Sequence, residues 1–286
     1  MNLPRRLLIT GGSGYLGRHL TTKASKTYDV YTTYRGQADQ IVAGQPLALD
    51  LIDRAAVFKL VTDLKPQAII HTAAINPGSG DEALMLRVNA EGSRYVAEAA
   101  VAVGARLVHV SSDNVHGGQH SPYADEAPPT PLNGYGRSKA AAEANVAAIN
   151  PQAAIVRTSL IYGLTEMDRG TVGFVERLQS GQQLLLFSDV VRQPVWLETL
   201  SEALLKLTRL DYSGLLNVVG RQALTREEFG RRMLAYWQID FGNQLGSGRA
   251  VDISDTIPLD IRLTVSKGEH LLQMPFLGVD EVLALT

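Results

Sequence analysis

Tyr135 and Lys139 place a phenol and an ammonium group at a spacing that suits proton transfer. Residues four apart lie on the same face of a helix, one turn from each other. A phenol has an ordinary pKa of about 10, and a neighbouring cation lowers it by favouring the phenolate. Reduction of a ketone needs a hydride at carbon and a proton at oxygen, so the pair predicts proton donation by Tyr135, with Lys139 lowering its pKa. The same spacing also occurs by chance on exposed helices, so the prediction depends on the surrounding motifs.

Two serines and an aspartate, Ser111, Ser112 and Asp113, stand at the end of the predicted strand Arg106–Ser111. Open α/β sheets bind their ligands at the carboxyl ends of the strands. A hydroxyl at that edge can hold a substrate carbonyl, although serines here can also simply cap a turn. Because a proline-rich loop then leads directly to Tyr135, we expect these residues to form one site.

A glycine-rich loop, residues 11 to 17, follows the predicted strand Arg6–Thr10 and opens a helix. Its glycines allow a tight turn and let the backbone approach a pyrophosphate at the helix N-terminus. A P-loop would need Lys and then Ser or Thr where Arg18 and His19 stand. A hydrolase elbow would need glycine where Tyr15 stands. The loop therefore predicts a dinucleotide cofactor held by Gly11, Ser13, Gly14, Tyr15, Leu16 and Gly17.

The end of the predicted second strand, Asp29–Tyr34, indicates which dinucleotide is bound. Sites for NAD usually carry an acidic residue there, whereas the 2′-phosphate of NADP needs a cation. This strand ends without a carboxylate and is followed by Arg35. The sequence therefore favours NADP(H) over NAD(H). Asp50 and Leu51, after the third strand, are expected either to meet the adenine or, for Asp50, to cap the next helix.

Short apolar runs alternate with helix-period segments through the first half of the chain, which is typical of a parallel sheet built from βαβ units. The clearest helix is Asp81–Val103, with an apolar stripe expected in the core. The predicted strands are Arg6–Thr10, Asp29–Tyr34, Pro46–Asp50, Gln67–Thr72, Arg106–Ser111 and Ala153–Thr158. The prediction is an α/β protein with a doubly wound (Rossmann) sheet.

After about Gly163 the alternation fades, which predicts a smaller C-terminal lobe for the substrate. We expect residues 1–163 to bind the cofactor and carry the catalytic residues, and residues 164–286 mainly to bind substrate. One strand and one helix of the second part should return to the first. The later segments are helical at Gly173–Gln179, Thr199–Leu210 and Thr225–Trp237, with a strand at Leu215–Val218.

Composition narrows the class of protein. The 286 residues carry a formal net charge of -2, which offers no basic surface for nucleic acid. Cysteine is absent, which removes disulfides and thiolate chemistry and fits a cytoplasmic location. No apolar run reaches the roughly 18 residues of a membrane span. His71 and His109 are expected to be satisfied core or cofactor-side histidines, and no metal site is predicted.

These motifs together resemble the extended short-chain dehydrogenase/reductases, and among them the dTDP-4-dehydrorhamnose reductase-like group. The resemblance covers nearly the whole chain. It includes the glycine loop, His71-Thr72-Ala73-Ala74, Asn89, the segment from Ser111 to Gly117, Tyr135 with Lys139, and Arg157-Thr158-Ser159. The chain departs from the group at Asn114, His116 and Leu160, where aromatic residues are usual, so the sugar pocket is expected to differ. Dehydration is disfavoured, because Asn114 stands where dehydratases carry a second acid.

The resemblance implies an NADP(H)-dependent reductase of a keto group on a nucleotide-linked deoxysugar, as in dTDP-rhamnose biosynthesis, and a homodimer. Ser112, Tyr135 and Lys139 would be catalytic, Asn89 mainly structural, and Ala73, Ala74 and Ser111 would contact the cofactor. Two alternatives remain open: a sugar-nucleotide epimerase that keeps its cofactor bound, and a non-catalytic NADP-binding regulatory subunit. The implied substrate contacts are Ile75, Asn76, Asp113, His116, Arg192 and Gln193.

Overall fold

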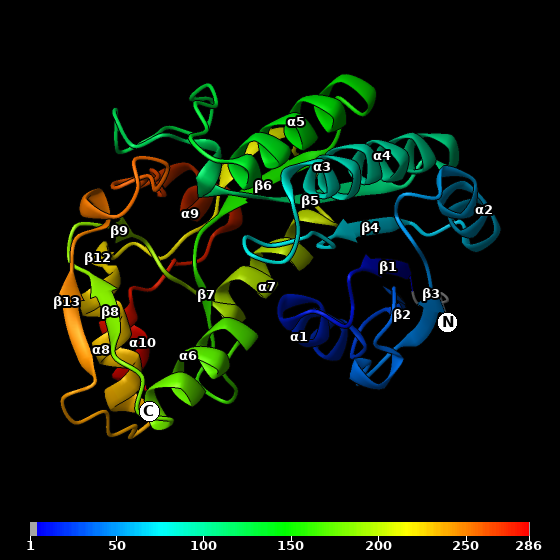
Figure 1. Cartoon of the computed structure of the whole chain (residues 1–286). Coiled ribbons are helices and arrows are strands. Elements are labelled where there is room, and N and C mark those ends of the chain that lie inside the picture. Colours follow the sequence, from blue (N-terminus) through cyan, green and yellow to red (C-terminus); the bar gives the residue numbers. More distant parts are fainter. Residues whose placement is uncertain (1–4, 286) are drawn as a thin grey trace.

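The computed structural model describes residues 5–285 and contains one seven-stranded sheet (Figure 1). All its strands are parallel, in the order β11-β6-β5-β4-β1-β2-β3. The chain order reverses between β1 and β4, which is where doubly wound sheets bind their ligands. The predicted fold class is therefore confirmed. The strands are β1 Arg6–Thr10, β2 Asp29–Tyr34, β3 Gln45–Ala48, β4 Ala68–His71, β5 Arg106–Ser112, β6 Ala154–Thr158 and β11 Gly214–Asn217.

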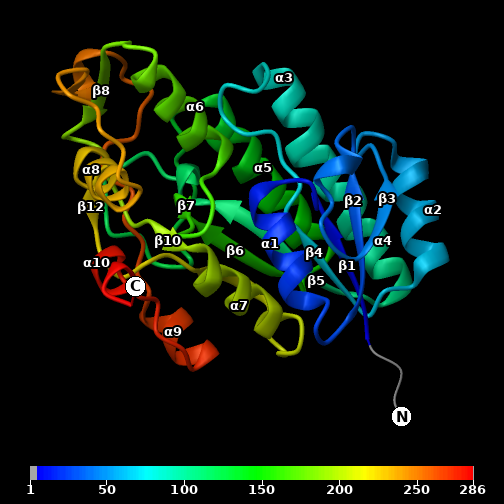
Figure 2. The same ribbon diagram turned by 90° about the horizontal axis from the view of Figure 1, so that it is seen from below.

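Helices cover both faces of this sheet (Figures 1 and 2). Successive side chains of a strand point to opposite faces. Leu7 and Ile9 of β1 accordingly pack in one core with α1 (Tyr15–Ala24) and α7 (Leu197–Leu207). Leu8 packs in a second core with the helices of the other face, α2 Arg54–Leu64, α4 Gly92–Val103 and α5 Gly134–Ile149. Burial on both faces explains why the central strands are continuous apolar runs.

The predicted helix Asp81–Val103 consists of α3 (Glu82–Met85), a π-helical segment η2 (Leu86–Glu91) and α4. In η2 the buried Asn89 accepts a hydrogen bond from the Ile75 amide at 2.7 Å and donates to the Ile75 carbonyl at 3.0 Å. It also donates to Ser138 Oγ of α5 at 3.0 Å. π-helical turns often occur near functional sites. This one ties the segment after β4 to α5.

After residue 163, β11 joins the main sheet and α7 packs against it, and most of the other elements form a smaller lobe (Figure 1). Two-stranded sheets in the second half of the chain pair β13 with β8, β12 with β9, and β10 with β7. The bounds of these strands are β7 Ile161–Tyr162, β8 Leu184–Phe187, β9 Val191–Arg192, β10 Val195–Trp196, β12 Leu224–Thr225 and β13 Leu245–Gly248. The remaining helices are α6 Arg169–Gln179, α8 Arg226–Tyr236, α9 Ser266–Leu272 and α10 Val279–Leu283. Within residues 5–285 the 3-10 turns are η1 Ala38–Gln40, η3 Asp113–Val115 and η4 Ala250–Asp252.

The sequence missed the small sheets of this lobe. β13 reads Leu245-Gly246-Ser247-Gly248, and glycine is poorly suited to strands, so the local pattern carries no strand signal. The third strand is displaced from the predicted Pro46–Asp50 to Gln45–Ala48. The domain boundary at residue 163 remains a prediction. No helix within residues 5–285 is long and apolar enough to cross a membrane.

Candidate active site

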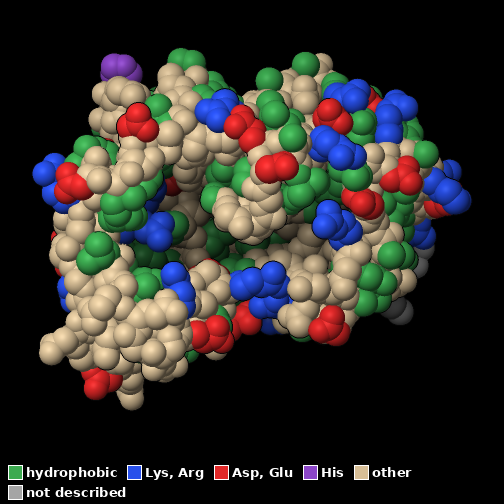
Figure 3. Space-filling model, viewed as in Figure 1, with side chains coloured by type: hydrophobic (Ala, Val, Ile, Leu, Met, Phe, Trp, Pro, Cys, Tyr) green, Lys and Arg blue, Asp and Glu red, His purple; other side chains and the backbone are tan. Residues whose placement is uncertain are grey.

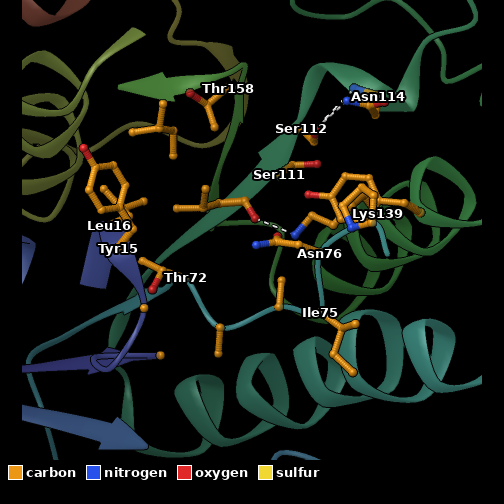
Figure 4. Close-up of a pocket in the computed structure, with 18 of the residues that line it drawn as sticks. Tyr15, Leu16, Thr72, Ile75, Asn76, Ser111, Ser112, Asn114, Lys139 and Thr158 are labelled. Atoms are coloured by element: carbon orange, nitrogen blue, oxygen red, sulfur yellow. Dashed lines mark hydrogen bonds between the residues drawn. The ribbon is translucent and has the colours of Figure 1, made fainter. Parts of the chain in front are cut away.

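A cleft of about 770 Å³ opens at the carboxyl edge of the main sheet, and the space-filling view shows this hollow between the two lobes (Figure 3). Its lining includes all three predicted catalytic residues, Ser112, Tyr135 and Lys139; Figure 4 shows Ser112 and Lys139 there. The smaller lobe contributes Phe187 and Arg192. The cleft also brings together the predicted cofactor contacts Gly11, Ser13, Gly14, Tyr15, Leu16, Gly17, Arg35, Asp50, Leu51, Ala73, Ala74 and Ser111.

The glycine loop has the shape of a phosphate cradle. Gly11 has a φ of 76°, and a Cβ there would lie 2.8 Å from the Cα of Ala73. A Cβ on Gly17 would lie 2.1 Å from the carbonyl oxygen of Gly11. Side chains at either position would therefore collide with backbone and displace the loop that leads into the N-terminus of α1, where an anion is favoured. These residues fit the pyrophosphate of a dinucleotide.

At the end of β2, Arg35 is exposed and lines the cleft. Within residues 5–285 its guanidinium has neither a hydrogen bond nor an ion pair, so it is available to a ligand phosphate. Asp50 does not cap the following helix, because Asp53 does so by accepting from the amide of Ala56 at 3.0 Å. Asp50 instead accepts from the amide of Ile52 at 3.2 Å and faces the cleft.

Tyr135 lies in the first turn of α5, which begins where Asn133 accepts a hydrogen bond from the Gly136 amide at 2.9 Å. Its side chain is partly open to the cleft and lies beside Ser112. Burial raises the pKa of Tyr135 to about 12; the neighbouring Ser112 hydroxyl opposes this increase, and the charge of Asp113 adds to it. Tyr135 therefore carries its proton at neutral pH, and its pKa is raised by burial and not lowered by Lys139 as the sequence predicted.

Lys139 lies one turn further along α5 and is 2% exposed. Its Nζ donates to the carbonyl oxygen of Val110 in β5 at 2.7 Å (Figure 4). Burial lowers the pKa of Lys139 to about 8, and the nearby carboxylate of Glu143 limits that decrease. The ammonium form therefore predominates at neutral pH, although less strongly than for an exposed lysine.

Asp113 is buried beside these residues, and both of its carboxylate oxygens accept hydrogen bonds from neighbouring side chains. Its Oδ1 accepts from Ser112 Oγ at 3.1 Å and from Asn114 Nδ2 at 2.9 Å. Its Oδ2 accepts from Ser159 Oγ at 2.5 Å and lies 3.9 Å from Arg192 Nε. Asp113 therefore orients the serine hydroxyl. Asn114 and Ser159 are not among the site residues predicted from the sequence; Asn114 directly follows the predicted Asp113, whereas no predicted site residue is close to Ser159 in the chain.

Ile75, Asn76 and Arg192, expected to contact substrate, also line the cleft. Arg192 is 5% exposed, and its guanidinium donates to the Pro258 carbonyl at 2.8 Å and the Val191 carbonyl at 2.7 Å. Most of this guanidinium is thus committed to the backbone. Arg192 therefore lines the site, but its guanidinium mainly supports the backbone of the smaller lobe and is not a free cation.

His116 and Gln193 do not line the cleft, which corrects their expected contact with substrate. His116 is fully buried, stacks on Tyr123 with ring centroids 3.9 Å apart, and lies 3.2 Å from Arg157 Nη1. Gln193 is 6% exposed, and its Oε1 accepts from the Leu263 amide at 2.6 Å. Both side chains are turned into the protein, a direction that the sequence does not reveal.

Arg226, at the start of α8, is a cleft residue that the sequence reasoning missed. Within residues 5–285 its guanidinium has no hydrogen bond or ion pair, and the nearby charges that act on it are those of Asp113 and Asp168. It lies where the cleft meets a second cavity of about 500 Å³. The two cavities share Tyr15, Leu160, Ile161, Asp168, Phe187 and Arg226.

His71 and His109 lie side by side beneath the site, with ring centroids 5.3 Å apart. His71 is satisfied as expected, by Thr10 Oγ1 at 2.6 Å and Ser93 Oγ at 3.0 Å. His109 is not, because neither ring nitrogen has a partner among the described residues. Burial lowers the pKa of His71 to about 3 and that of His109 well below its usual value. In residues 5–285 no group of acidic or histidine side chains could hold a metal ion.

Known proteins share this architecture. The family described as the RmlD substrate binding domain matches residues 5–251. A dTDP-4-keto-6-deoxy-D-glucose reductase from Streptomyces niveus is 33% identical over 221 residues, which are 74% of this chain and 72% of that protein. Methionine adenosyltransferase 2 subunit beta from Mus musculus is 36% identical over 174 residues, which are 58% of this chain and 50% of that protein.

Among solved structures, the dTDP-4-dehydrorhamnose reductase from Bacillus anthracis, in complex with NADP, matches with a TM-score of 0.84. The match covers 99% of this chain and 98% of that one at 24% sequence identity. It therefore shows that the two proteins share a fold along their whole length.

Proposed function

This chain belongs to the RmlD substrate binding domain family, and we propose that it is an NADP(H)-dependent oxidoreductase that reduces a keto group on a nucleotide-linked deoxysugar. The observation that carries the proposal is the placement of Tyr135 beside Ser112, with Lys139 one helical turn away, in a cleft that also contains the glycine cradle. This arrangement has a proton donor, a hydrogen bond for a carbonyl oxygen and a dinucleotide site.

Each residue has a role that follows from its chemistry. When bound, the nicotinamide cofactor supplies the hydride. Ser112 would turn its hydroxyl proton from Asp113 to the carbonyl oxygen, and Tyr135 would donate its proton to that oxygen. The pKa of about 12 means that Tyr135 holds the proton until the oxygen becomes strongly basic. The positive charge of Lys139 stabilises the phenolate that remains.

Two joined cavities support a nucleotide-linked substrate. The reacting sugar would lie in the cleft near Ser112, and the unpaired guanidinium of Arg226 would bind the diphosphate at the junction. The second cavity would hold the nucleoside, because its lining is rich in aromatic residues that can stack on a base, among them Phe174, Phe229 and Trp237.

NADP(H) is proposed as the preferred cofactor because Arg35 is free at the position that meets the 2′-phosphate and no acidic residue ends β2. A homodimer and a cytoplasmic location remain further expectations. Size-exclusion chromatography with light scattering measures the first, and fractionation of cells that produce the protein measures the second.

The function is tested by titrating the protein with NADPH and with NADH, followed by fluorescence, and then adding a dTDP-4-keto-6-deoxysugar. We expect tighter binding of NADPH and loss of its fluorescence on addition of the sugar nucleotide. Binding without oxidation across a panel of keto sugar nucleotides would contradict the reductase. Equal affinity for both cofactors would contradict only the role of Arg35.

A regulatory role is the second candidate, favoured by the similarity to a methionine adenosyltransferase beta subunit. Absence of turnover, together with a stable complex with another enzyme, would favour it. An epimerase would instead keep its nicotinamide through purification and turn over without added NADPH. The intact set of Ser112, Tyr135 and Lys139 supports catalysis over the regulatory role.

A further inference from the structure

Glu143 and Arg157 form a buried ion pair directly behind the site. Arg157 lies on β6 and its side chain is 0% exposed; that of Glu143, on α5, is 6% exposed. The guanidinium donates to both carboxylate oxygens, with Nε to Oε1 at 3.0 Å and Nη2 to Oε2 at 2.8 Å. A buried ion pair is often no more stabilising than apolar residues of the same size. Its location next to the reacting groups is therefore the more informative property.

The carboxylate of Glu143 joins α5 to the end of β5. Ser111 Oγ donates to Glu143 Oε1 at 2.6 Å. Lys139, one turn earlier, donates to the Val110 carbonyl at 2.7 Å, and Tyr135, another turn earlier, lies beside Ser112. Three successive turns on one face of α5 thus face three successive residues of β5, and the turns of Lys139 and Glu143 are hydrogen bonded to them.

Arg157 also holds the loop that connects Ser112 to α5. Its Nη1 donates to the carbonyl oxygens of Asp125 at 3.0 Å and Ala127 at 2.9 Å. The same nitrogen lies 3.2 Å from Nε2 of His116, in the same loop. One guanidinium therefore fixes the strand, the helix and the loop that together place the serine opposite the tyrosine.

We propose that Glu143 and Arg157 are positioning residues for the reaction: the pair holds α5 against the end of β5 so that Ser112, Tyr135 and Lys139 keep their reactive spacing. This inference rests on the proposed reductase function, and neither residue lines the cleft. A displacement of about 1 Å between reacting groups can cost about 100-fold in rate, so the pair has a large effect without touching substrate.

The charge of Glu143 also acts on Lys139. Burial lowers the pKa of that lysine, and Glu143 opposes the effect. The other titratable groups that face Lys139 are His71 on β4 and His109 on β5, both neutral near pH 7 because burial lowers their pKa, and Tyr135 on α5, which is also neutral. Removing the negative charge of Glu143 should therefore lower the pKa of Lys139 further.

The test compares Glu143→Gln with the double variant Glu143→Gln/Arg157→Met, which leaves no charge unpaired. The matched control is Glu82→Gln, because Glu82 accepts from Arg137 of the same helix α5 at 2.6 and 2.7 Å but is exposed. We measure kcat, KM for NADPH and for the keto sugar nucleotide, the pH profile, and thermal unfolding.

We expect Glu143→Gln to lower kcat by about 10- to 100-fold with little change in KM for NADPH, and to shift the alkaline limb to lower pH. The double variant should recover thermal stability but not kcat, and Glu82→Gln should behave like the unmodified protein. Unchanged kcat in the folded Glu143→Gln variant, or recovery of kcat with stability in the double variant, would overturn the proposal.

A second readout needs no substrate. The pKa of Lys139 can be followed by NMR in protein with labelled lysine side chains, with Lys139→Arg used to assign the signal. The pKa should fall in Glu143→Gln and stay constant in Glu82→Gln. If the unmodified protein turns over no keto sugar, the proposed function fails, and this titration alone decides whether Glu143 governs Lys139; an unchanged pKa overturns the inference.

Discussion

At the residue scale, the site depends on two groups whose pKa values are moved in opposite directions by the same burial. The pKa of Tyr135 rises to about 12 and that of Lys139 falls to about 8. At neutral pH the phenol is therefore protonated and the ammonium is charged. These are the forms that proton donation to a carbonyl oxygen requires.

Replacement of Tyr135 by Phe removes the proposed proton donor and keeps the ring. We expect kcat to fall by about 10² to 10⁴, the usual loss for a positioned acid. Binding of NADPH should survive, because the glycine cradle is unchanged. Steady-state kinetics and a fluorescence titration check both parts, and normal turnover in this variant would refute the assigned role.

Lys139 should set an alkaline limit on turnover. Its ammonium form is present below the pKa of about 8 and is lost above it, so kcat should decrease as the pH rises through that value. In Lys139→Arg the charge persists, because arginine stays protonated. Its residual activity should therefore lack the decline near pH 8. A profile of the unmodified protein that stays flat to pH 10 would contradict this assignment.

At the scale of elements, α1 and α5 bring the site together. The glycine loop brings the N-terminus of α1 against the cleft, and Asn133 begins α5 so that Tyr135 falls in its first turn. The π-helical segment η2 holds the chain after β4 through Asn89. Each of these contacts fixes the end of a helix or strand at the cleft. A small movement of any of these ends would therefore displace residues of the site.

Gly17→Ala should weaken cofactor binding, because the new Cβ would lie 2.1 Å from the Gly11 carbonyl oxygen and force the loop to move. Gly173→Ala is the matched control within α6, where a Cβ meets no atom within 4 Å. The control should bind NADPH normally and gain about 0.5–1 kcal/mol of stability. Titration with NADPH and thermal unfolding distinguish the two, and equal affinities would contradict the cradle.

At the scale of the whole molecule, the buried histidines link folding to pH. Burial lowers the pKa of His71 to about 3 and that of His116 to about 4, whereas an unfolded chain binds a proton on each near pH 6.5. As the pH falls below about 6.5, these histidines bind protons in the unfolded chain but not in the folded chain. The free energy of unfolding should therefore decrease until the pH passes the folded pKa values.

His109 should also contribute to the decrease in the free energy of unfolding at low pH, because burial lowers its pKa. Both of its ring nitrogens are without a hydrogen-bond partner among the described residues. We expect His109→Leu to raise the free energy of unfolding by about 1–3 kcal/mol at pH 7, the usual cost of an unsatisfied buried polar group. The decrease between pH 6.5 and 4 should also become shallower. Urea unfolding across pH measures both effects, with the exposed His120→Leu as control; a less stable His109→Leu would show that the imidazole has a partner.

The fold, the glycine loop and the presence of Ser112, Tyr135 and Lys139 in one cleft could be predicted from the sequence, because each rests on a short local pattern. A buried parallel strand is an apolar run, and the spacing of Tyr135 and Lys139 is a property of one helix. Only the tertiary structure decided what depends on distant segments. It turned His116 into the protein, exposed Arg226 between two cavities, and joined Glu143 to Arg157 across a strand and a helix. Side-chain direction and pairing follow from packing, which a one-dimensional pattern does not contain.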